Sequence, residues 1–308
     1  RMKQGNKLFF HLLALVVVGI WGTTFISTKI LLSNNLTPSV IFVIRFTMAY
    51  IGIWLLCLKS KNTRKLFSKS FMDELLFILL GITGGSMYFY TENTALIHTQ
   101  ACNASFIVCC APLITVLLTL TAKKFKRFRH SNSLEDVKLN IWIISGTIFA
   151  MVGMALMLFN GYKFELSPKG DILAFLAALC WGIYSMFMVH HSKKYGVIFA
   201  TRKVFFWGLI TILPFAHGEF AALNKDIFAN NEVIFNLLFL GIVASLFCFV
   251  LWNKVMERLG NVTSTNYVYL NPIFTLVGSI IVLNEHVTPI AAIGCALILI
   301  GVILSGKR

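Results

Sequence analysis

Charged residues, and acidic ones above all, are scarce in this sequence. Only 13% of the 308 residues are charged, and 12 Asp and Glu stand against 27 Lys and Arg. Because charged residues approach a quarter of a soluble protein, this shortage excludes an ordinary water-soluble domain. The sequence also has no glycine-rich phosphate loop, no Ser/His/Asp order and no HExxH pair. We therefore expect neither direct ATP coupling nor enzymatic activity.

Patterns of metal ligands are missing as well. The seven cysteines form no CxxC pair and no Cys/His spacing of a metal site, so we predict no metal and no cofactor. His190 and His191 stand beside two lysines at the end of an apolar run, where a solvated interface is expected. The cysteines are expected to act as small apolar side chains; they are Cys57, Cys102, Cys109, Cys110, Cys180, Cys248 and Cys295.

What the chain does have is apolar residues in long runs. Hydrophobic residues make up 57% of it, and its mean hydropathy is +0.80. A transmembrane helix needs about 20 apolar residues. The sequence therefore predicts an all-α integral membrane protein with ten transmembrane helices. The ten runs are 8–31, 38–58, 75–97, 103–122, 140–160, 169–189, 197–217, 233–256, 262–283 and 288–305.

The net charge of +15 is concentrated in alternate connecting segments. With ten spans and an inside start, most Lys and Arg fall on the inner side, against Lys163, Lys169 and Lys225 on the outer side. This positive-inside bias predicts a multi-pass protein of a bacterial-type inner membrane with both termini in the cytoplasm. The basic run at 123–129 is then expected to touch anionic membrane lipid, not nucleic acid.

The apolar runs fall into two similar halves. Residues 81–125 align without a gap on residues 241–285, so that Pro112 meets Pro272. Recurrence at a fixed offset indicates an internal repeat. We predict two five-helix repeats, at 8–160 and 169–306. Because five is an odd number, the second repeat enters the membrane from the opposite side.

An inverted repeat predicts how the molecule works. Inverted repeats are typical of alternating-access carriers, whose substrate site lies near the midplane between the halves. We therefore expect a secondary transporter that moves a small organic solute. Its expected partners are that solute and membrane lipid, and we expect a monomer. The alternatives are a duplicated bundle without transport and a facilitative channel or pore; a carrier saturates and shows counterflow, whereas a pore does not.

The last run of each half has a pair of glycines seven residues apart. The pairs are Gly146 with Gly153 and Gly294 with Gly301. Glycines two turns apart lie on one helix face and allow a neighbouring helix to approach closely.

Several motifs resemble the EamA-type transporters of the drug/metabolite transporter superfamily. They are the Trp-Gly pairs at Trp21 and Trp181, the arginine early in the second run, YTENTAL at 90–96 and NYVYLNPIFT at 266–275. This resemblance implies a ten-helix inner-membrane carrier, often an exporter of amino acids, metabolites or toxic compounds. It implies a central cavity walled by helices 1, 3, 4, 6, 8 and 9, with helices 5 and 10 at the periphery. The family's glutamate after helix 9 is Glu285, whereas the first half has Phe125 there.

Ionisable residues inside spans are few and usually mark a pathway. Glu92 and Arg45 are expected about 7 Å and 10 Å below the outer surface. We hypothesise an ion pair or a shared water network, in which Glu92 binds a cationic group or takes up a proton; a purely structural pair is the alternative. Arg202 and Glu257 are their inner counterparts and candidate gate residues. Lys29 is expected to snorkel or to meet Glu285.

Uncharged polar and aromatic residues at helical spacing are the remaining candidates for the cavity wall. Interhelical hydrogen bonding is the simpler account of any single one of them. The predicted cavity set is Trp21, Thr24, Thr28, Tyr88, Glu92, Asn93, Trp181, Ser185, Trp252, Asn253, Tyr267 and Asn271, with Arg45, Glu92, Arg202 and Glu257 as the gating or coupling set.

Overall fold

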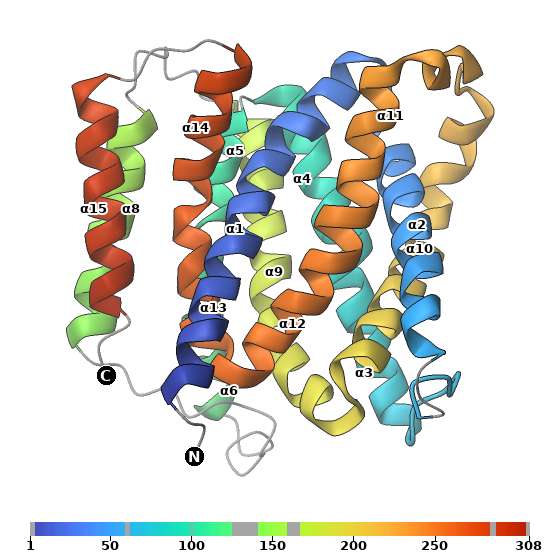
Figure 1. The fold of residues 1–308 in the computed structure, drawn as a ribbon, viewed down its shortest axis with the longest axis horizontal. Helices are drawn as coiled ribbons and strands as arrows, with labels where there is room; N and C mark the ends of the chain where they lie inside the picture. The colour runs from blue at the N-terminus through green and yellow to red at the C-terminus, as the bar shows by residue number, and fades with distance from the viewer. Residues whose placement is uncertain are drawn as a thin grey trace.

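The computed structural model describes residues 4–58, 62–99, 101–124, 141–158, 167–283 and 288–305. Within these ranges all regular structure is helical and no strand occurs. The helices stand side by side, and α1 begins at the same end of the bundle at which α15 ends (Figure 1). The predicted all-α class is confirmed.

Eight helical segments are long and apolar enough to cross a membrane, and two more are shorter. The eight are Lys7–Ser33, Pro38–Cys57, Phe71–His98, Asn103–Ala122, Pro168–Tyr195, Val197–Ala221, Asn231–Leu259 and Asn261–Val282. The shorter ones, Ile141–Leu156 and Ala292–Ser305, fall at the other two predicted spans, 140–160 and 288–305. The last helix begins at Pro289, whose missing N–H group is tolerated at the first position of a helix.

The first half of the chain forms two long helices followed by a series of shorter ones. Ser70 caps the third by accepting a hydrogen bond from the Met72 N–H, and Asp73 and Glu74 follow in its first turn, where acidic groups are favoured. The elements are α1 (Gln4–Ser33), α2 (Pro38–Cys57), α3 (Phe71–Gly81), the π-helical η1 (Ile82–Ser86), α4 (Met87–His98), α5 (Ala101–Val108), α6 (Ala111–Lys124) and α8 (Ile141–Leu158).

The second half repeats this pattern. Gly196 (φ 85°) and Gly260 (φ 89°) make the tight joints before α10 and α13, because glycine adopts positive φ without strain. The elements are α9 (Pro168–Tyr195), α10 (Val197–Ala221), η2 (Lys225–Ala229), α11 (Asn231–Leu238), the π-helical η3 (Phe239–Phe247), α12 (Cys248–Leu259), α13 (Asn261–Thr265), the 3₁₀ segment η4 (Asn266–Leu270), α14 (Asn271–Leu283) and α15 (Pro289–Ser305).

Irregular backbone occurs at equivalent places in the two halves. The π-helical η1 at 82–86 corresponds to 242–246 within η3. The predicted helix at 103–122 is broken at residues 109–110, and η4 interrupts the equivalent span before Pro272. Both breaks precede a proline, which cannot donate the helical hydrogen bond. The predicted span 103–122 is therefore present, with a local break at residues 109–110.

Helices of one half pack mainly against helices of the other. α1 contacts α12 and α14, and α9 contacts α4 and α6. The glycines of the two Trp-Gly pairs allow this approach. A Cβ on Gly22 would lie 2.5 Å from Phe274 Cβ of α14, and one on Gly182 would lie 2.8 Å from Ile114 Cγ2 of α6.

The pair α8 and α15 lies at one edge of the bundle (Figure 1). A Cβ on Gly146 would lie 2.5 Å from the Gly301 carbonyl oxygen, and one on Gly153 would lie 2.5 Å from that of Gly294. The predicted close approach of these two helices is confirmed, and the pairing of early with late residues makes them antiparallel.

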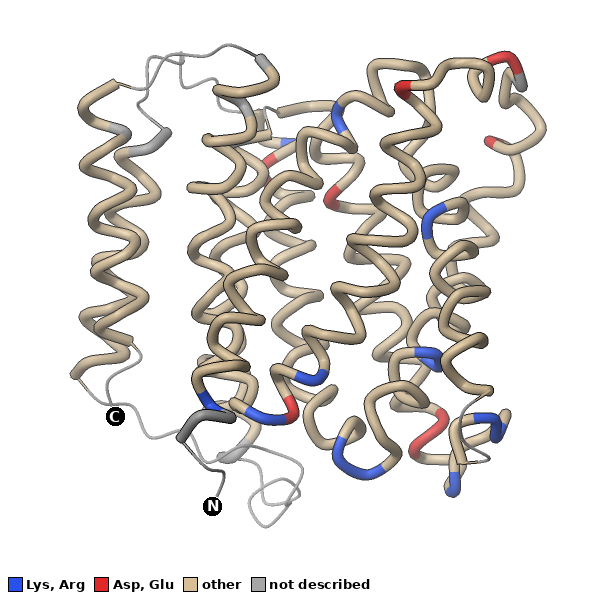
Figure 2. Tube along the Cα trace, in the orientation of Figure 1, with Lys and Arg blue, Asp and Glu red and all other residues tan. Residues whose placement is uncertain are grey.

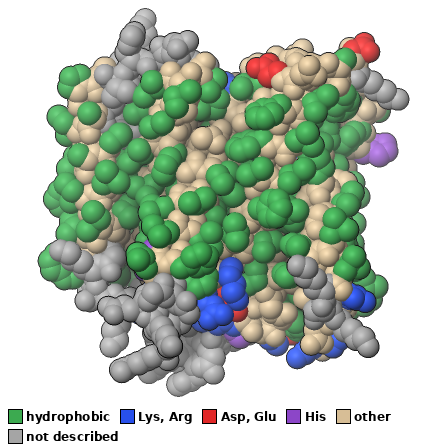
Figure 3. Space-filling model, viewed as in Figure 1, with side chains coloured by type: hydrophobic (Ala, Val, Ile, Leu, Met, Phe, Trp, Pro, Cys, Tyr) green, Lys and Arg blue, Asp and Glu red, His purple; other side chains and the backbone are tan. Residues whose placement is uncertain are grey.

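The outer surface is that of a protein in a bilayer. Hydrophobic side chains cover the middle of the face in Figure 3, and basic side chains lie toward its lower edge. Along the backbone, Lys and Arg gather at the end where α1 begins (Figure 2). We call this the basic end, and the other the opposite end.

Candidate solute cavity

A cavity of about 430 Å³ lies among helices of both halves. Six of the predicted cavity residues line it: Trp21, Thr24, Tyr88, Glu92, Trp181 and Asn271. Arg45, which we predicted in the gating set, lines it too, together with the apolar residues Phe25, Phe89, Val108, Phe249 and Val268. The cavity therefore combines aromatic walls with one carboxylate and one guanidinium.

Aromatic rings from both halves form the wall. The rings of Trp21 and Trp181 meet edge to face with centroids 5.4 Å apart, and Tyr88 lies 5.1 Å from Trp181. Phe249 contacts both tryptophans, at 5.6 Å and 5.9 Å. Such edge-to-face pairs are favourable because a ring's positive edge meets a negative face. The wall thus joins α1, α4, α9 and α12.

Glu92 is held by the tyrosine one turn before it. Tyr88 and Glu92 are four residues apart on α4 and so share a face, and the Tyr88 hydroxyl donates to Glu92 Oε1 at 2.8 Å. Both residues are buried, with 8% and 7% of their surface exposed. A buried carboxylate in a membrane span is costly unless it is paired or hydrated, which marks Glu92 as a functional candidate.

Arg45 faces the same cavity from α2 but is held by other groups. Its Nε donates to Ser245 Oγ at 2.8 Å, and its guanidinium carbon lies 4.4 Å from the centre of the Phe89 ring. Among the described residues no ion pair joins Arg45 to Glu92. The two charges share the cavity without the direct pair that we hypothesised, because each has a neutral partner closer by.

Two polar atoms at the cavity wall have no hydrogen-bond partner within the described chain. They are the indole nitrogen Nε1 of Trp181, a donor, and Oδ1 of Asn271, an acceptor. Buried polar groups are nearly always hydrogen-bonded, so a solute with both kinds of group would gain two bonds here.

Trp21 differs from its repeat partner in this respect. Its Nε1 donates to the carbonyl oxygen of Ala244 at 3.0 Å. Ala244 belongs to the π-helical η3, in which the helical hydrogen-bond pattern is shifted. Trp21 is thus tied to the backbone, whereas Trp181 is free to bind.

The other predicted cavity residues do not line it, and all of them except the half-buried Tyr267 are buried. Asn253 accepts from the Tyr184 hydroxyl at 2.7 Å and donates to Thr201 at 2.8 Å. Asn93 donates to the Pro38 carbonyl at 3.3 Å. The sequence pattern placed these residues on the correct spans but could not separate the cavity face from the interhelical face.

Four further members of the predicted set have similar positions. Trp252 packs behind Trp21 with ring centroids 5.1 Å apart, and the Tyr267 hydroxyl lies 2.6 Å from His11 Nδ1. Thr28 and Ser185 are buried, and neither lines the cavity.

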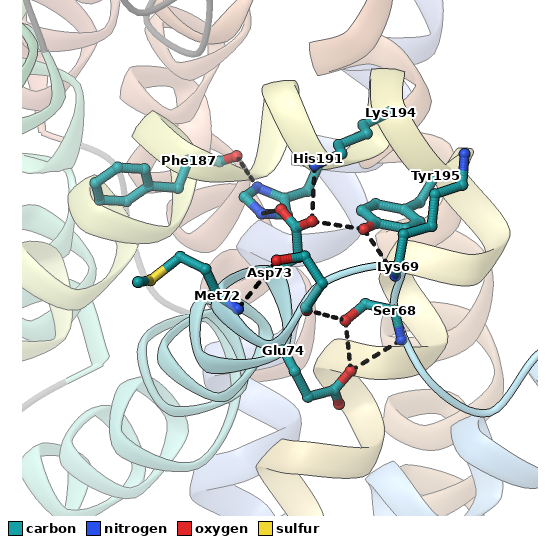
Figure 4. A network of polar contacts seen from close by, with 10 residues as sticks. Ser68, Lys69, Met72, Asp73, Glu74, Phe187, His191, Lys194 and Tyr195 are labelled. Atoms are coloured by element: carbon teal, nitrogen blue, oxygen red, sulfur yellow. Dashed lines mark hydrogen bonds and ion pairs between the residues drawn. The ribbon is translucent and has the colours of Figure 1, made fainter.

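A polar network that the sequence analysis missed joins the halves at the basic end (Figure 4). Asp73 Oδ2 of α3 accepts hydrogen bonds from Lys194 Nζ and from the Tyr195 hydroxyl, each at 2.7 Å. His191 Nε2 lies 3.8 Å from Asp73 Oδ1 and is 1% exposed. His191 is therefore buried, contrary to the solvated interface that we expected.

The neighbouring Glu74 forms a second part of this network. Its carboxylate accepts from Trp207 Nε1 at 2.9 Å and from Ser68 Oγ at 2.8 Å, and it pairs with Lys203. We call the contacts of Asp73 and Glu74 with α9 and α10 the basic-end clasp. Their signal in the sequence was two adjacent acids in a stretch where nearly every charge is positive.

The predicted inner gate pair is not formed. Arg202 donates to the Thr63 carbonyl at 2.6 Å and to that of Lys65, while Glu257 pairs with Lys254 at 2.5 Å within α12. Arg202 thus binds the backbone of the 62–70 segment, and the ion pairs between the halves among the described residues of this end are those of the clasp.

Lys29 caps the C-terminal end of α4. Its Nζ donates to the carbonyls of Leu96 and Thr99 at 2.7 Å and 3.0 Å, where a cation suits the helix C-terminus. The expected partner Glu285, the paired position Phe125 and the basic run at 123–129 fall wholly or in part outside the described residues.

A bundle of apolar helices from two similar halves, enclosing a charged cavity, defines a membrane transport protein. A sequence model of the EamA-like transporter family matches residues 8–126 and again residues 168–306. The chain belongs to this family, and it is a multi-pass membrane transporter.

Curated relatives that are named as transporters agree with this assignment. An uncharacterized transporter of Archaeoglobus fulgidus is 26% identical over 97% of this chain and 97% of its own. A probable terminal-alkyne amino-acid exporter of Streptantibioticus cattleyicolor is 28% identical over 75% of this chain and 72% of its own. A solved crystal structure matches with a TM-score of 0.69 at 18% identity, covering 98% of this chain and 96% of that one, which supports the fold alone.

Proposed function

We propose that this protein is a secondary transporter that exports a small zwitterionic, amino-acid-like solute across a bacterial-type inner membrane by alternating access. The observation that carries the proposal is a cavity with aromatic walls that is lined by one carboxylate, Glu92, and one guanidinium, Arg45.

The charges of Glu92 and Arg45 suit a solute that carries one positive and one negative group. Glu92 attracts an ammonium group and Arg45 a carboxylate, while the unpaired Trp181 N–H and Asn271 Oδ1 offer a further donor and acceptor. The tryptophan and phenylalanine rings would pack against an apolar side chain and add cation–π attraction to the ammonium. The relative named as an amino-acid exporter supports the same solute class.

Support for alternating access comes from paired contacts between the halves. Each contact of α1 with α12 and α14 has its counterpart in the contacts of α9 with α4 and α6. Ten helices in two inverted five-helix repeats would produce this exchange of partners. One arrangement of such repeats opens the cavity to one side and its mirror opens it to the other.

The basic-end clasp serves as the gate on one side. Asp73 and Glu74 belong to the first half, and Lys194 and Lys203 to the second, so opening this end must break both ion pairs. At the opposite end the described residues join the halves by a neutral contact, Asn230 to Asn34 at 3.2 Å, and by Ser39 with Glu219. Because basic segments stay in the cytoplasm, we assign the clasp to the cytoplasmic face.

The test begins with a thermal-shift screen of amino acids and related solutes on the purified protein. Solutes that stabilise it are then measured for counterflow in liposomes. We expect saturable uptake that is accelerated by solute on the far side. Linear uptake without such acceleration supports the alternative of a facilitative channel, and absence of any flux refutes transport of that solute.

A further inference from the structure

A second cavity, separate from the solute cavity, lies at the basic end beside the clasp. It is open to solvent, has a volume of about 520 Å³, and lies between the segment that joins α2 to α3 and the joint between α9 and α10. Its lining consists of three lysines, one asparagine and three aromatic residues: Lys65, Lys69, Lys194, Asn62, Phe67, Tyr195 and Phe199.

Of the three lysines that line this cavity, only one has an acidic partner among the described residues. Lys194 pairs with Asp73, but no carboxylate among the described residues lies within ion-pairing distance of Lys65 or Lys69. No acidic residue of the described ranges lines the cavity. Clustered cations without counter-charges repel each other and attract an anion.

The loop that presents these lysines is fixed in place. Arg202 donates to the Thr63 carbonyl at 2.6 Å and to that of Lys65, and Lys203 donates to the Leu66 carbonyl at 3.1 Å. The Lys69 N–H donates to the Tyr195 hydroxyl at 3.1 Å. Two buried cations of α10 thus bind the backbone of the loop, and its own lysine side chains remain available.

We propose that this cavity binds a phosphate-bearing anion through Lys65, Lys69 and Lys194. Basic pockets between helices at the cytoplasmic face suit the phosphate of a lipid headgroup, and the ring of Phe67, which lines the cavity with 75% of its surface accessible, offers an apolar contact for a lipid chain. A free phosphate has the same charge and hydrogen-bond acceptors. Because Lys194 belongs to both sites, a phosphate here competes with Asp73 and links the cavity to the clasp.

Binding is measured on the full chain in detergent, by native mass spectrometry and by thermal shift. The probes are phosphatidylglycerol, neutral phosphatidylcholine and inorganic phosphate. The variant Lys65→Gln/Lys69→Gln removes two exposed charges and leaves the clasp intact. The matched control Lys7→Gln/Lys193→Gln removes two charges at the same end that do not line the cavity. The variant Lys65→Arg/Lys69→Arg keeps the charge.

We expect phosphatidylglycerol to bind the unchanged protein and the arginine variant, and to bind the glutamine variant about 30-fold more weakly, since each lysine near an anionic lipid contributes about a factor of five. Equal binding of inorganic phosphate would identify a soluble phosphate as the source and leave the site standing. If neither anion distinguishes the glutamine variant from the control, or if phosphatidylcholine binds as well, the proposal is overturned. A glutamine variant that fails to fold is replaced by Lys65→Gln and Lys69→Gln singly, each expected to lose about fivefold.

Discussion

Single residues decide what the solute cavity can hold. Glu92 and Arg45 enter it from different helices, and each is held by a neutral side chain, Tyr88 and Ser245. A solute that reaches both charges does not have to break an existing ion pair. We therefore expect the cavity to accept a solute that carries both charges.

Replacing Glu92 by Gln keeps the size of the side chain and removes its charge. We expect the affinity for a zwitterionic solute to fall about 10- to 100-fold, because hydrogen bonds to charged groups contribute about 1.5–3 kcal/mol. The measurement is solute binding by thermal shift, followed by counterflow and its pH dependence. Glu232→Gln, an exposed acid of α11, is the control. Unchanged binding, rate and pH profile in Glu92→Gln would contradict a role in transport.

The two repeat-related tryptophans allow a matched comparison. Trp21→Phe leaves the Ala244 carbonyl without its donor, so we expect the free energy of unfolding to fall by about 1–3 kcal/mol beyond the loss of ring size. Trp181→Phe removes a donor that has no partner, and we expect it mainly to weaken solute binding. Melting temperature and solute affinity are measured for both. If both variants lost the same melting temperature and the same solute affinity, the proposed difference between Trp21 and Trp181 would be refuted.

At the scale of elements, the irregular segments and the glycine contacts set the shape of the bundle. π-helical turns occur often at functional sites, and η3 supplies both the carbonyl bound by Trp21 and the Ser245 that holds Arg45. The α8–α15 pair lies outside this region and lines no part of the cavity. We therefore expect the close packing of α8 against α15 to contribute to stability and not to solute binding.

Gly146→Ala tests that packing. The added methyl group would meet the Gly301 carbonyl oxygen at 2.5 Å, and we expect a loss of about 1–3 kcal/mol in stability. Gly218→Ala in α10, where nothing lies within 4 Å of the new atom, is the matched control and should keep or slightly raise the melting temperature. Solute affinity at a temperature where both variants are folded should not change. A Gly146→Ala protein as stable as the control would show that the pair can separate freely.

The sequence predicted what depends on local pattern. The apolar runs located the helices, and the glycine spacing at Gly146 and Gly153 identified a real contact. The break before Pro112 was missed because hydrophobicity continues through it. The clasp was missed because Asp73 and Lys194 are 121 residues apart, and no local period links them. The unequal partners of Trp21 and Trp181 could not be read from two identical Trp-Gly motifs.

For the whole molecule, the two ends differ in the strength with which they hold the halves together. The basic end has two ion pairs between the halves, whereas the described residues of the opposite end have none. In the proposed carrier, we expect this difference to make the opposite end open more easily than the basic end. Removing one charge of the clasp should then change which end is closed at rest.

Asp73→Asn should weaken closure of the basic end. We expect hydrogen–deuterium exchange at 68–74 and 191–203 to rise by up to about fivefold, because a partly exposed ion pair contributes at most about 1 kcal/mol. In a carrier, exchange at 30–39 and 219–231 should fall at the same time. Glu257→Gln, which breaks a pair within α12 only, is the control. A rise at both ends would indicate general loosening, and no change would remove the clasp as a gate.

The tie between Trp21 and η3 also bears on how such a chain can evolve. After a duplication, a tryptophan that completes the backbone of another helix is under constraint from folding, whatever the cargo. Its twin, Trp181, packs its ring in the aromatic wall but has no backbone partner for its N–H, so the solute adds to the constraint on it. Among descendants of one ancestor, replacements at Trp181 should therefore accompany changes of solute, while position 21 stays tryptophan.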